Sequence, residues 1–355
     1  MSANSDLLHA LQRLPALAHL QTGDLAPLSS KGTAHGHVAI VPPIADRKLV
    51  VRIAYAFPGD PAAAARLETQ AEAFRRCAPS GCTPRLFGLV PPGEALPGGA
   101  LIVDRIDGRA PRLPQEIGLM ARSLAAIHAL PVPATAMAAP LSFPADAVAA
   151  LLQAIETNAR FFDSMAMDGK TRLALGEELA FARDYAASKM RGQPEPVLAL
   201  ADTHPGNFIV DAAGTAWFVD LEKAHYGAAA IDLAHATLET STRWDRDVNL
   251  VLPREAIVAF YREYLNLIGS ARAQRLHPFL LPLRRMTWLR TMAFMARWSV
   301  QTDPAYPGTE PDRWSDLGLS DEMKSHSRAT IADLYRPQTV ERIRREWLAG
   351  DSLAL

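Results

Sequence analysis

Three polar residues in the second half of the chain have the types and spacing needed for phosphoryl transfer: Asp202, Asn207 and Asp220. Mg²⁺ takes carboxylate or amide oxygens together with phosphates and water, and Asn207 and Asp220 can supply such oxygens. Phosphoryl transfer also needs a carboxylate that orients the attacking hydroxyl group, and Asp202 is the remaining acid. The sequence therefore predicts a magnesium site with a free carboxylate next to it.

A short hairpin is expected to bring these residues together. Phe208–Val210 and Trp217–Val219 are apolar runs typical of strands, and the Asp, Ala and Gly residues between them are typical of a turn. If the two strands pair antiparallel around residues 212–215, position 207 faces position 220. We therefore expect the amide of Asn207 beside the carboxylate of Asp220, with the first acid at the mouth of the same hairpin.

The loop motif taken alone has an equally good structural explanation. The string D-T-H-P-G-N at 202–207 is typical of an ordinary polar turn between strands. The second acid, in register across the hairpin, favours a functional site. The apolar runs on both sides also bury the hairpin, so polar residues at its end are harder to explain as mere surface.

The segment from Asp202 to Ala234 resembles the aminoglycoside phosphotransferase and choline kinase family, relatives of the protein kinases. The catalytic segment of that family reads H-x-D-x-H-x-x-N, then a hairpin, then D-x-E/D, then D-L-A. The matching residues here are Asp202, His204, Asn207, Asp220, Glu222 and Asp232-Leu233-Ala234. One position departs from the pattern, because Leu200 stands where the family has its first His.

This resemblance implies a role for each matching residue. Asp202 is the expected catalytic base, and His204 belongs to the same catalytic motif. Asn207 and Asp220 are the expected metal ligands, and Asp232 is expected to buttress the loop. The implied reaction moves the γ-phosphate of ATP to a hydroxyl group of a small molecule, with Mg²⁺ as the metal.

A strand with an internal cation is expected near the N-terminus. In K-L-V-V-R-I-A-Y at 48–55, alternation places Val50 and Arg52 on one face and Leu49, Val51 and Ile53 on the other. A cation inside an apolar strand is costly unless it meets an anion. The resemblance implies that Arg52 contacts nucleotide phosphates, which Arg can do bidentately. An edge-strand contact with solvent is the alternative.

Two further elements of the small lobe are implied by the resemblance. A helix at 61–78 should supply a Glu that pairs with the strand cation, and Glu68 is favoured over Glu72 because it lies nearer the buried stripe. The turn from Gly32 to Gly36 stands where a kinase-like fold covers the phosphates. Its G-x-x-x-G spacing fits a plain hairpin turn equally well.

A hinge is expected where the strand pattern gives way to helices. The apolar strand 100–103 is followed by Asp104 and Ile106, which resembles the segment whose backbone groups receive adenine in the family. Beyond it, apolar residues at helical spacing predict a run of helices. The expected ranges are 115–131, 146–163, 170–191, 229–240, 254–268, 278–300, 320–334 and 338–349. His128 is interpreted as a structural residue in the first of them.

The charge of the acceptor molecule is left open by two neighbouring segments. Arginines in the run at 284–298 could line an acceptor pocket, although an amphipathic core helix with solvated arginines is the favoured interpretation. The following loop at 302–318 is acidic and aromatic, which suits a cationic substrate. The arginines favour the opposite charge.

Bulk properties exclude several classes of protein. With 355 residues, 49% of them hydrophobic, the chain is long enough for about two domains with a sizeable core. A net charge of −1 gives no electrostatic case for binding nucleic acid or an anionic membrane. Cys77 and Cys82 have neither zinc nor redox spacing. Without an apparent signal peptide or membrane span, we expect a cytoplasmic monomer or dimer.

These observations predict an α+β, two-lobed, protein-kinase-like fold. Residues 1–104 should form a nucleotide-binding lobe with an antiparallel sheet and one helix, and residues 105–355 a mainly helical catalytic and substrate-binding lobe. The predicted function is that of an ATP- and Mg-dependent small-molecule phosphotransferase. A catalytically inactive, kinase-like nucleotide-binding protein is the main alternative. A metal-dependent hydrolase is a third one, but it needs more metal ligands than the sequence offers.

Overall fold

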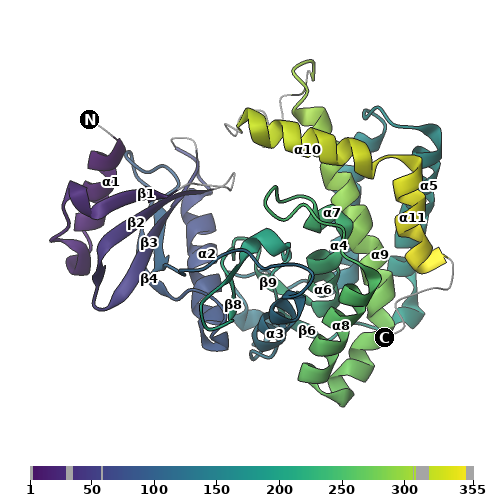
Figure 1. Cartoon of the computed structure of the whole chain (residues 1–355), viewed down its shortest axis with the longest axis horizontal. Coiled ribbons are helices and arrows are strands. Elements are labelled where there is room, and N and C mark those ends of the chain that lie inside the picture. The colour runs from purple at the N-terminus through teal and green to yellow at the C-terminus, as the bar shows by residue number, and fades with distance from the viewer. Residues whose placement is uncertain (1–2, 29–34, 57–58, 307, 309–319, 349–355) are drawn as a thin grey trace.

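The small lobe is built on a sheet at the N-terminal end of the molecule (Figure 1). The computed structural model describes residues 3–28, 35–56, 59–306, 308 and 320–348. Within them, five antiparallel strands form this sheet in the order β1-β2-β3-β5-β4. The strands are β1 (Leu25–Leu28), β2 (His35–Ile44), β3 (Arg47–Ala54), β4 (Leu86–Val90) and β5 (Ala100–Asp104). The strand that carries Arg52 is central, because β3 pairs with β2 on one side and β5 on the other.

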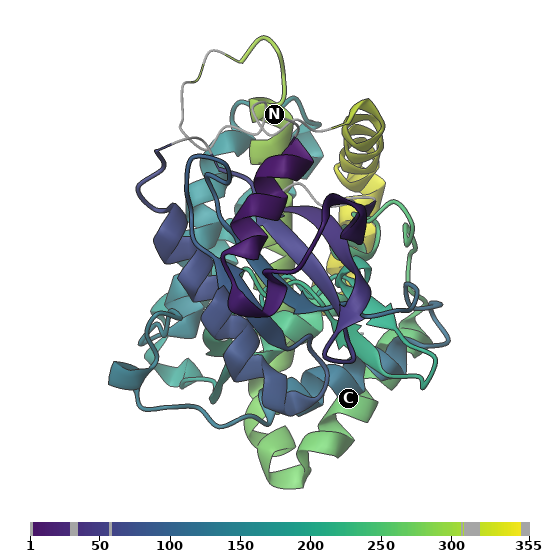
Figure 2. The same cartoon turned by 90° about the vertical axis from the view of Figure 1, so that its left-hand side faces the viewer.

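The two faces of the sheet have different covers, as the alternation in β3 predicts. Leu49 and Val51 pack on the outer face in a cluster with residues of α1 (Ala3–Gln12), which lies in front of the strands in Figure 2. Val50 packs on the inner face with α2 (Ala63–Cys77). The inner cluster continues into the large lobe, so one hydrophobic core spans both parts of the molecule.

The helix α2 lies between the sheet and the large lobe. Its buried residues include Ala63, Leu67, Ala71 and Phe74, which lie at helical spacing on one face. Arg76 ties the last turn to the large lobe. Its guanidinium donates to the backbone carbonyls of residues 138 (2.6 Å) and 139 (2.8 Å).

The large lobe is mainly helical, as expected, and its longest described helix, α9, is central to it (Figure 1). Its helices are α3 (Ile117–His128), α4 (Ala147–Ala159), α5 (Gly169–Ala187), α6 (Ala229–Thr237), α7 (Glu239–Thr242), α8 (Arg254–Ile268), α9 (Ser270–Gln301), α10 (Asp321–Leu334) and α11 (Pro337–Leu348). Short 3₁₀ turns are Pro15–Leu17, Thr22–Asp24, Ala78–Ser80, Thr135–Met137, Arg160–Phe162, Lys189–Arg191 and Pro205–Asn207. Both α4 and α6 pack on α9.

Two small strand pairs lie in the large lobe and flank the segments that carry Asp202, Asn207 and Asp220. They are β6 (Pro196–Ala199) with β9 (His225–Ala228), and β7 (Phe208–Val210) with β8 (Ala216–Phe218). Both pairs are antiparallel. Among the residues described, no helix is both long enough and apolar enough to cross a membrane.

The expectation that the arginines of α9 are solvated is wrong for the first two of the run. Arg284 is 1% exposed and donates to Glu346 (2.7 Å). Arg285 donates to both oxygens of the buried Glu178. The helical periodicity predicts the helix correctly. The two arginines are nevertheless not solvated, because carboxylates from α5 and α11 bind them in place of water.

The inner core predicts the effect of removing the largest α2 side chain. Phe74 is fully buried beside Val50 and the sheet. Phe74→Ala should lower the free energy of unfolding by about 3–5 kcal/mol, since it leaves a cavity in a shared core. Urea unfolding measures this loss. Leu173→Ala, at a residue 67% exposed on α5, is the matched control and should stay within about 0.5 kcal/mol of the wild type. Equal effects of the two substitutions would contradict the packing described here.

Candidate active site

The loop that carries Asp202 is fixed by a buried carboxylate. Asp232 in α6 is fully buried and accepts hydrogen bonds from the backbone amides of Leu200 (2.7 Å) and Ala201 (2.8 Å). The hydroxyl of Thr203 donates to the Asp232 carbonyl (2.6 Å). Ala201 has φ of 61°, a left-handed conformation that a residue with a Cβ adopts only under constraint. The expectation that Asp232 buttresses the loop is confirmed by these contacts.

The buttress is itself held by a buried histidine. His128 Nε2 lies 3.1 Å from an Asp232 carboxylate oxygen, and its Nδ1 lies 2.8 Å from the hydroxyl of Tyr264. Burial would raise the pKa of Asp232, but His128 and the two loop amides outweigh it and lower the pKa. His128 is therefore structural, as the sequence indicates, and it keeps the buttress anionic.

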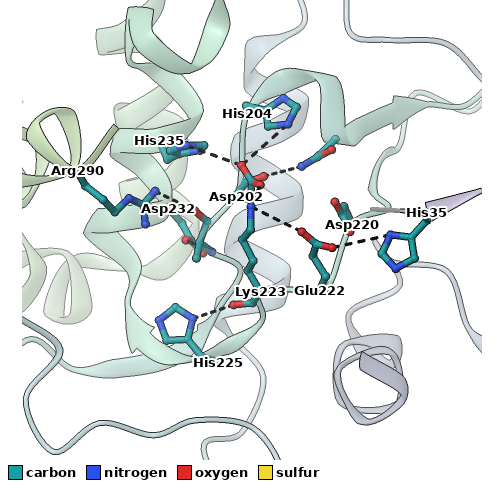
Figure 3. A network of polar contacts seen from close by, with 12 residues as sticks. His35, Asp202, His204, Asp220, Glu222, Lys223, His225, Asp232, His235 and Arg290 are labelled. Carbon is teal, nitrogen blue, oxygen red and sulfur yellow. Dashed lines mark hydrogen bonds and ion pairs between the residues drawn. The ribbon is translucent and has the colours of Figure 1, made fainter. Parts of the chain in front are cut away.

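Asp202 lies at the centre of a polar network (Figure 3). Lys223 donates to its Oδ2, while the Nε2 atoms of His235 and His204 lie 3.8 Å and 4.0 Å from its Oδ1. Burial would raise the pKa of Asp202, but the positive charge of Lys223 outweighs it and holds the pKa of Asp202 far below its ordinary value. Asp202 is thus an anion at any pH near neutrality.

The hairpin that follows has a register one residue away from the expected one. Phe208 pairs with Phe218, and the Asn207 carbonyl accepts from the amide of Val219 (3.0 Å), so Asn207 lies level with Val219 and not with Asp220. The reason lies in the turn. Asp211 belongs to it, because its carboxylate accepts from two turn amides and from an indole further along. The loop is therefore longer than composition indicates, and a slip of one residue changes every cross-strand partner.

Arg52 meets an anion, as its place inside an apolar strand requires. Its Nη2 donates to Oδ1 of Asp220 at 2.9 Å, and its Nη1 donates to the carbonyl of Val219. The guanidinium carbon also lies 5.5 Å from the centre of the Phe74 ring. Burial would raise the pKa of Asp220, but the charge of Arg52 lowers it. The two lobes therefore meet at an ion pair between the buried Arg52 and the partly buried Asp220.

The expected pairing of Arg52 with Glu68 is wrong. Glu68 lies on the solvent face of α2 and bonds with Arg75 (2.8 Å), while Glu72 bonds with Arg76 (2.8 Å). The face of α2 that carries Phe74 packs toward Arg52. Burying this aromatic side chain is favourable, whereas burying a glutamate carboxylate would cost desolvation free energy. Asp220 takes the place that the sequence assigns to the glutamate.

The remaining nucleotide-site predictions fall in the small lobe. Gly32 lies outside the described residues. Gly36 is a strand residue of β2 opposite Ile53, and not part of a turn. At the hinge, the Asp104 amide donates to the carbonyl of Arg85 (3.0 Å). Ile106 follows two residues later, and none of the described residues hydrogen-bonds to its backbone. Contacts of Asp104 and Ile106 with a nucleotide stay predictions.

Two site residues, Lys223 and His235, were missed by the sequence reasoning, and Arg290 was considered only as one of the arginines at 284–298 that could line an acceptor pocket. Lys223 directly follows the D-x-E motif, which gives it a recognisable place. His235 stands one helical turn after Asp232, on the same face of α6, and this spacing could have pointed to it. Arg290 donates to the carbonyl of Ala201 (3.0 Å) from a helix far away in sequence. No local pattern could have placed it beside the catalytic loop.

The oxygen atoms available near Asp202 suit an open magnesium site. The Asn207 amide nitrogen donates to the Asp202 carbonyl (2.8 Å), which fixes the side chain and leaves its Oδ1 without a donor among the described residues. Oδ2 of Asp220 likewise has none. No cluster of three or more His, Cys, Asp or Glu residues fit for a metal occurs in the described part of the chain. One carboxylate and one amide oxygen therefore fit a metal that takes its other ligands from phosphates and water.

Known structures with the same fold cover nearly the whole chain. A choline/ethanolamine kinase family protein from Mesorhizobium loti has 16% identity and a TM-score of 0.59, covering 97% of this chain and 99% of its own. The macrolide 2'-phosphotransferase of Brachybacterium faecium has 15% identity and a TM-score of 0.55, with 92% and 97% covered. Spectinomycin phosphotransferase in complex with ADP and spectinomycin has 12% identity and a TM-score of 0.55, with 90% and 91% covered. The two-lobed, protein-kinase-like fold is confirmed by these similarities.

Sequence comparison supplies the family. No curated protein sequence matches the chain. The profile of the phosphotransferase enzyme family matches residues 44–274, which include the strand cation Arg52, the catalytic loop, the hairpin and the buttress Asp232. This match covers more than half of the chain and contains the described site. The fold of this chain is similar to those of a choline/ethanolamine kinase family protein and of antibiotic phosphotransferases, and the chain belongs to the phosphotransferase enzyme family.

Proposed function

We propose that the chain transfers the γ-phosphate of ATP to a hydroxyl group of a small molecule, with Asp202 orienting that hydroxyl. The observation that carries this proposal is the position of Asp202. It is an anion on a loop pinned by Asp232, and it lies in one network with the Arg52–Asp220 pair that joins the two lobes. Membership of a phosphotransferase family supports the reaction class.

Asp220 and Asn207 would hold Mg²⁺ through the carboxylate and amide oxygens that lack donors in the described structure. When bound, the metal neutralises charge that develops on the transferred phosphoryl group. Glu222 lies beside this position, and burial and the charge of Asp220 raise its pKa. A raised pKa is expected where burial and neighbouring acids outweigh the effect of a nearby cation, here Lys223.

Arg52 is positioned to bind phosphate as well as Asp220. Its Nε is buried and has no hydrogen-bond partner among the described residues, so a phosphate oxygen would satisfy a donor that is costly to leave unpaired. The backbone of Ile106 at the hinge would receive the adenine. These contacts would place the nucleotide between the lobes, with its terminal phosphate toward Asp202.

The low pKa of Asp202 defines its part in the reaction. A carboxylate held far below neutrality by Lys223 is a weak proton acceptor, so its main effect is to accept a hydrogen bond from the acceptor hydroxyl and align it. The fixed loop lets this alignment occur without reorganisation. His204 stays a predicted member of the catalytic group, next to the same carboxylate.

Replacing Asp202 tests the orienting role. Asp202→Asn should lower phosphoryl transfer about 10²–10⁴-fold, because a neutral amide oxygen accepts the hydrogen bond of the hydroxyl more weakly and aligns it poorly. Affinity for Mg·ATP should change little. The acceptor comes from a screen of hydroxyl-bearing metabolites for ADP release. Asp163→Asn, whose side chain is 96% exposed, is the control and should keep full activity. Wild-type turnover by Asp202→Asn would disprove the assignment, and the absence of turnover in every protein despite Mg·ATP binding would identify an inactive nucleotide-binding relative.

Replacing Asp220 tests the metal site. Asp220→Asn keeps an acceptor for Arg52 and removes the charge that attracts Mg²⁺. It should weaken Mg·ATP binding at least tenfold, while binding of ATP without metal changes little, and Asn207→Ala should weaken it less. Calorimetric titration of nucleotide with and without Mg²⁺ measures both. If Asp220→Asn binds Mg·ATP as tightly as the wild type, the proposed metal site is wrong.

Removing Lys223 tests what holds the pKa of Asp202 low. In Lys223→Met the pKa of Asp202 should rise, because its principal compensating charge is lost while its burial remains. The protonated fraction then grows as pH falls, so the acidic limb of the kcat–pH profile should move to higher pH in the variant. Lys170→Met, at an exposed lysine on α5, should leave the profile unchanged. Superimposable profiles for wild type and Lys223→Met would argue against this electrostatic role.

A further inference from the structure

Arg290 differs from Arg284 and Arg285 of the same helix in its partners. Arg284 and Arg285 each bind a carboxylate, whereas Arg290 forms no ion pair within hydrogen-bond or salt-bridge distance among the described residues. Its one hydrogen bond in the described structure goes to the neutral carbonyl of Ala201, at 3.0 Å. The side chain is only partly exposed. A guanidinium has five N–H donors, so most of the donors of Arg290 are left for another molecule.

Arg290 lies on the side of Asp202 that faces away from the small lobe. Figure 3 shows Asp202 between two groups, with Asp220 and His35 on one side and His235 and Arg290 on the other. The contacts agree with this arrangement. Arg52 of the small lobe binds Asp220, whereas His235 lies 3.8 Å from Asp202 on the opposite side. A hydroxyl group aligned by Asp202 for attack on a terminal phosphate must approach from this far side.

The charge of Arg290 is not neutralised by direct contact there. The two acids that act on it electrostatically are Asp202 and Asp232. Each is already compensated, Asp202 by Lys223 and Asp232 by His128 and the loop amides. Burial lowers the pKa of Arg290, as expected for a cation that has lost much of its water without gaining a bonded anion.

The neighbouring histidine does not change this balance. His235 is 7% exposed, and burial followed by the charge of Arg290 lowers its pKa to about 3, so its imidazole is neutral near pH 7. Its Nδ1 has no hydrogen-bond partner among the described residues. Asp245, in the segment after α7, packs against Gly206 and accepts from the amides of residues 247 and 248.

We propose that Arg290 binds an anionic group of the acceptor, so that the substrate is a hydroxy compound bearing a carboxylate or a phosphate. This inference rests on the proposed function and names the substrate class for the same site. The anionic group and the reacting hydroxyl are separated by only a few bonds, because Arg290 bonds to the residue directly before Asp202. The planar guanidinium can bind either oxyanion with two parallel hydrogen bonds.

Selective stabilisation of the nucleotide-bound protein tests the charge of the acceptor. Mg²⁺ with a non-hydrolysable ATP analogue first fills the phosphate site, and its binding is checked separately by calorimetry. The melting temperature is then measured with glycerate, glycerol 3-phosphate, glycerol and choline, each at millimolar concentration. Glycerate or glycerol 3-phosphate should raise the melting temperature of the wild type, and the stronger of the two identifies carboxylate or phosphate as the anion. Glycerol and choline should have no effect.

Variants at Arg290 show whether this residue is responsible. Arg290→Gln keeps an N–H donor for the Ala201 carbonyl but removes the charge. The variant should fold, and its apparent affinity for the stabilising anion should fall at least tenfold. Arg290→Lys should retain part of it. Arg275→Met, at an exposed arginine of the same helix, is the control and should behave as the wild type.

Several outcomes would overturn the inference. Stabilisation by choline or glycerol alone, no response to either anion, or an unchanged response in Arg290→Gln would each do so. The wild-type selectivity decides the matter even if a variant does not fold. Failure of the ATP analogue to bind would instead contradict the proposed function, so the two failures are distinguishable.

Discussion

The buried carboxylate of Asp232 is the contact on which the site depends. It ties the helix α6 to the backbone of the catalytic loop through two amides, and His128 from α3 holds it in turn. Without this acceptor, the amides of Leu200 and Ala201 would be buried and unpaired, and the left-handed conformation at Ala201 would have no support. Leu200 fills the position of the family's first His and is fully buried, so the loop keeps its shape through backbone contacts and apolar packing.

A second buried charge connects the lobes. Arg52 from the centre of the sheet reaches Asp220, which follows the hairpin of the large lobe. Burying this pair costs desolvation energy, and its net contribution to stability is small or even unfavourable. Its value lies in position. It aligns β3, the strand proposed to contact the nucleotide, with Asp220, the acid proposed to bind the metal, and the Phe74 ring lies beside the guanidinium.

Charges in the site are arranged in compensated pairs with one exception. Lys223 balances Asp202, and Arg52 balances Asp220. Glu222 lies 3.8 Å from His35 and 3.7 Å from Lys223, with a raised pKa. Arg290 alone among these cations has no bonded anion in the described structure. A fold does not by itself fix the substrate, so this uncompensated cation is the feature on which the proposal of an anionic acceptor rests.

Much of the architecture follows from the sequence by itself. Alternation in β3 determined which side chains face each layer, and helical spacing determined α8 to the residue. The catalytic motif and its family resemblance located Asp202 and the acids after the hairpin. These features are local, because a strand or helix repeats every few residues and the pattern of burial follows that repeat.

Only the tertiary structure decided which groups bind each other. Arg52 and Asp220 are 168 positions apart, and Arg290 and Ala201 are 89 apart, so no periodic pattern relates them. Glu68 and Asp220 were both chemically suitable partners for Arg52. Because Phe74 packs on the inner face of α2, Glu68 faces solvent and only Asp220 of the two is within reach of Arg52. The hairpin register depended on one carboxylate, that of Asp211, taking up turn amides. Residue type thus determined which interactions each side chain could form. The packing of the folded chain decided which of the possible partners came within reach, because the local sequence does not encode distances between remote segments.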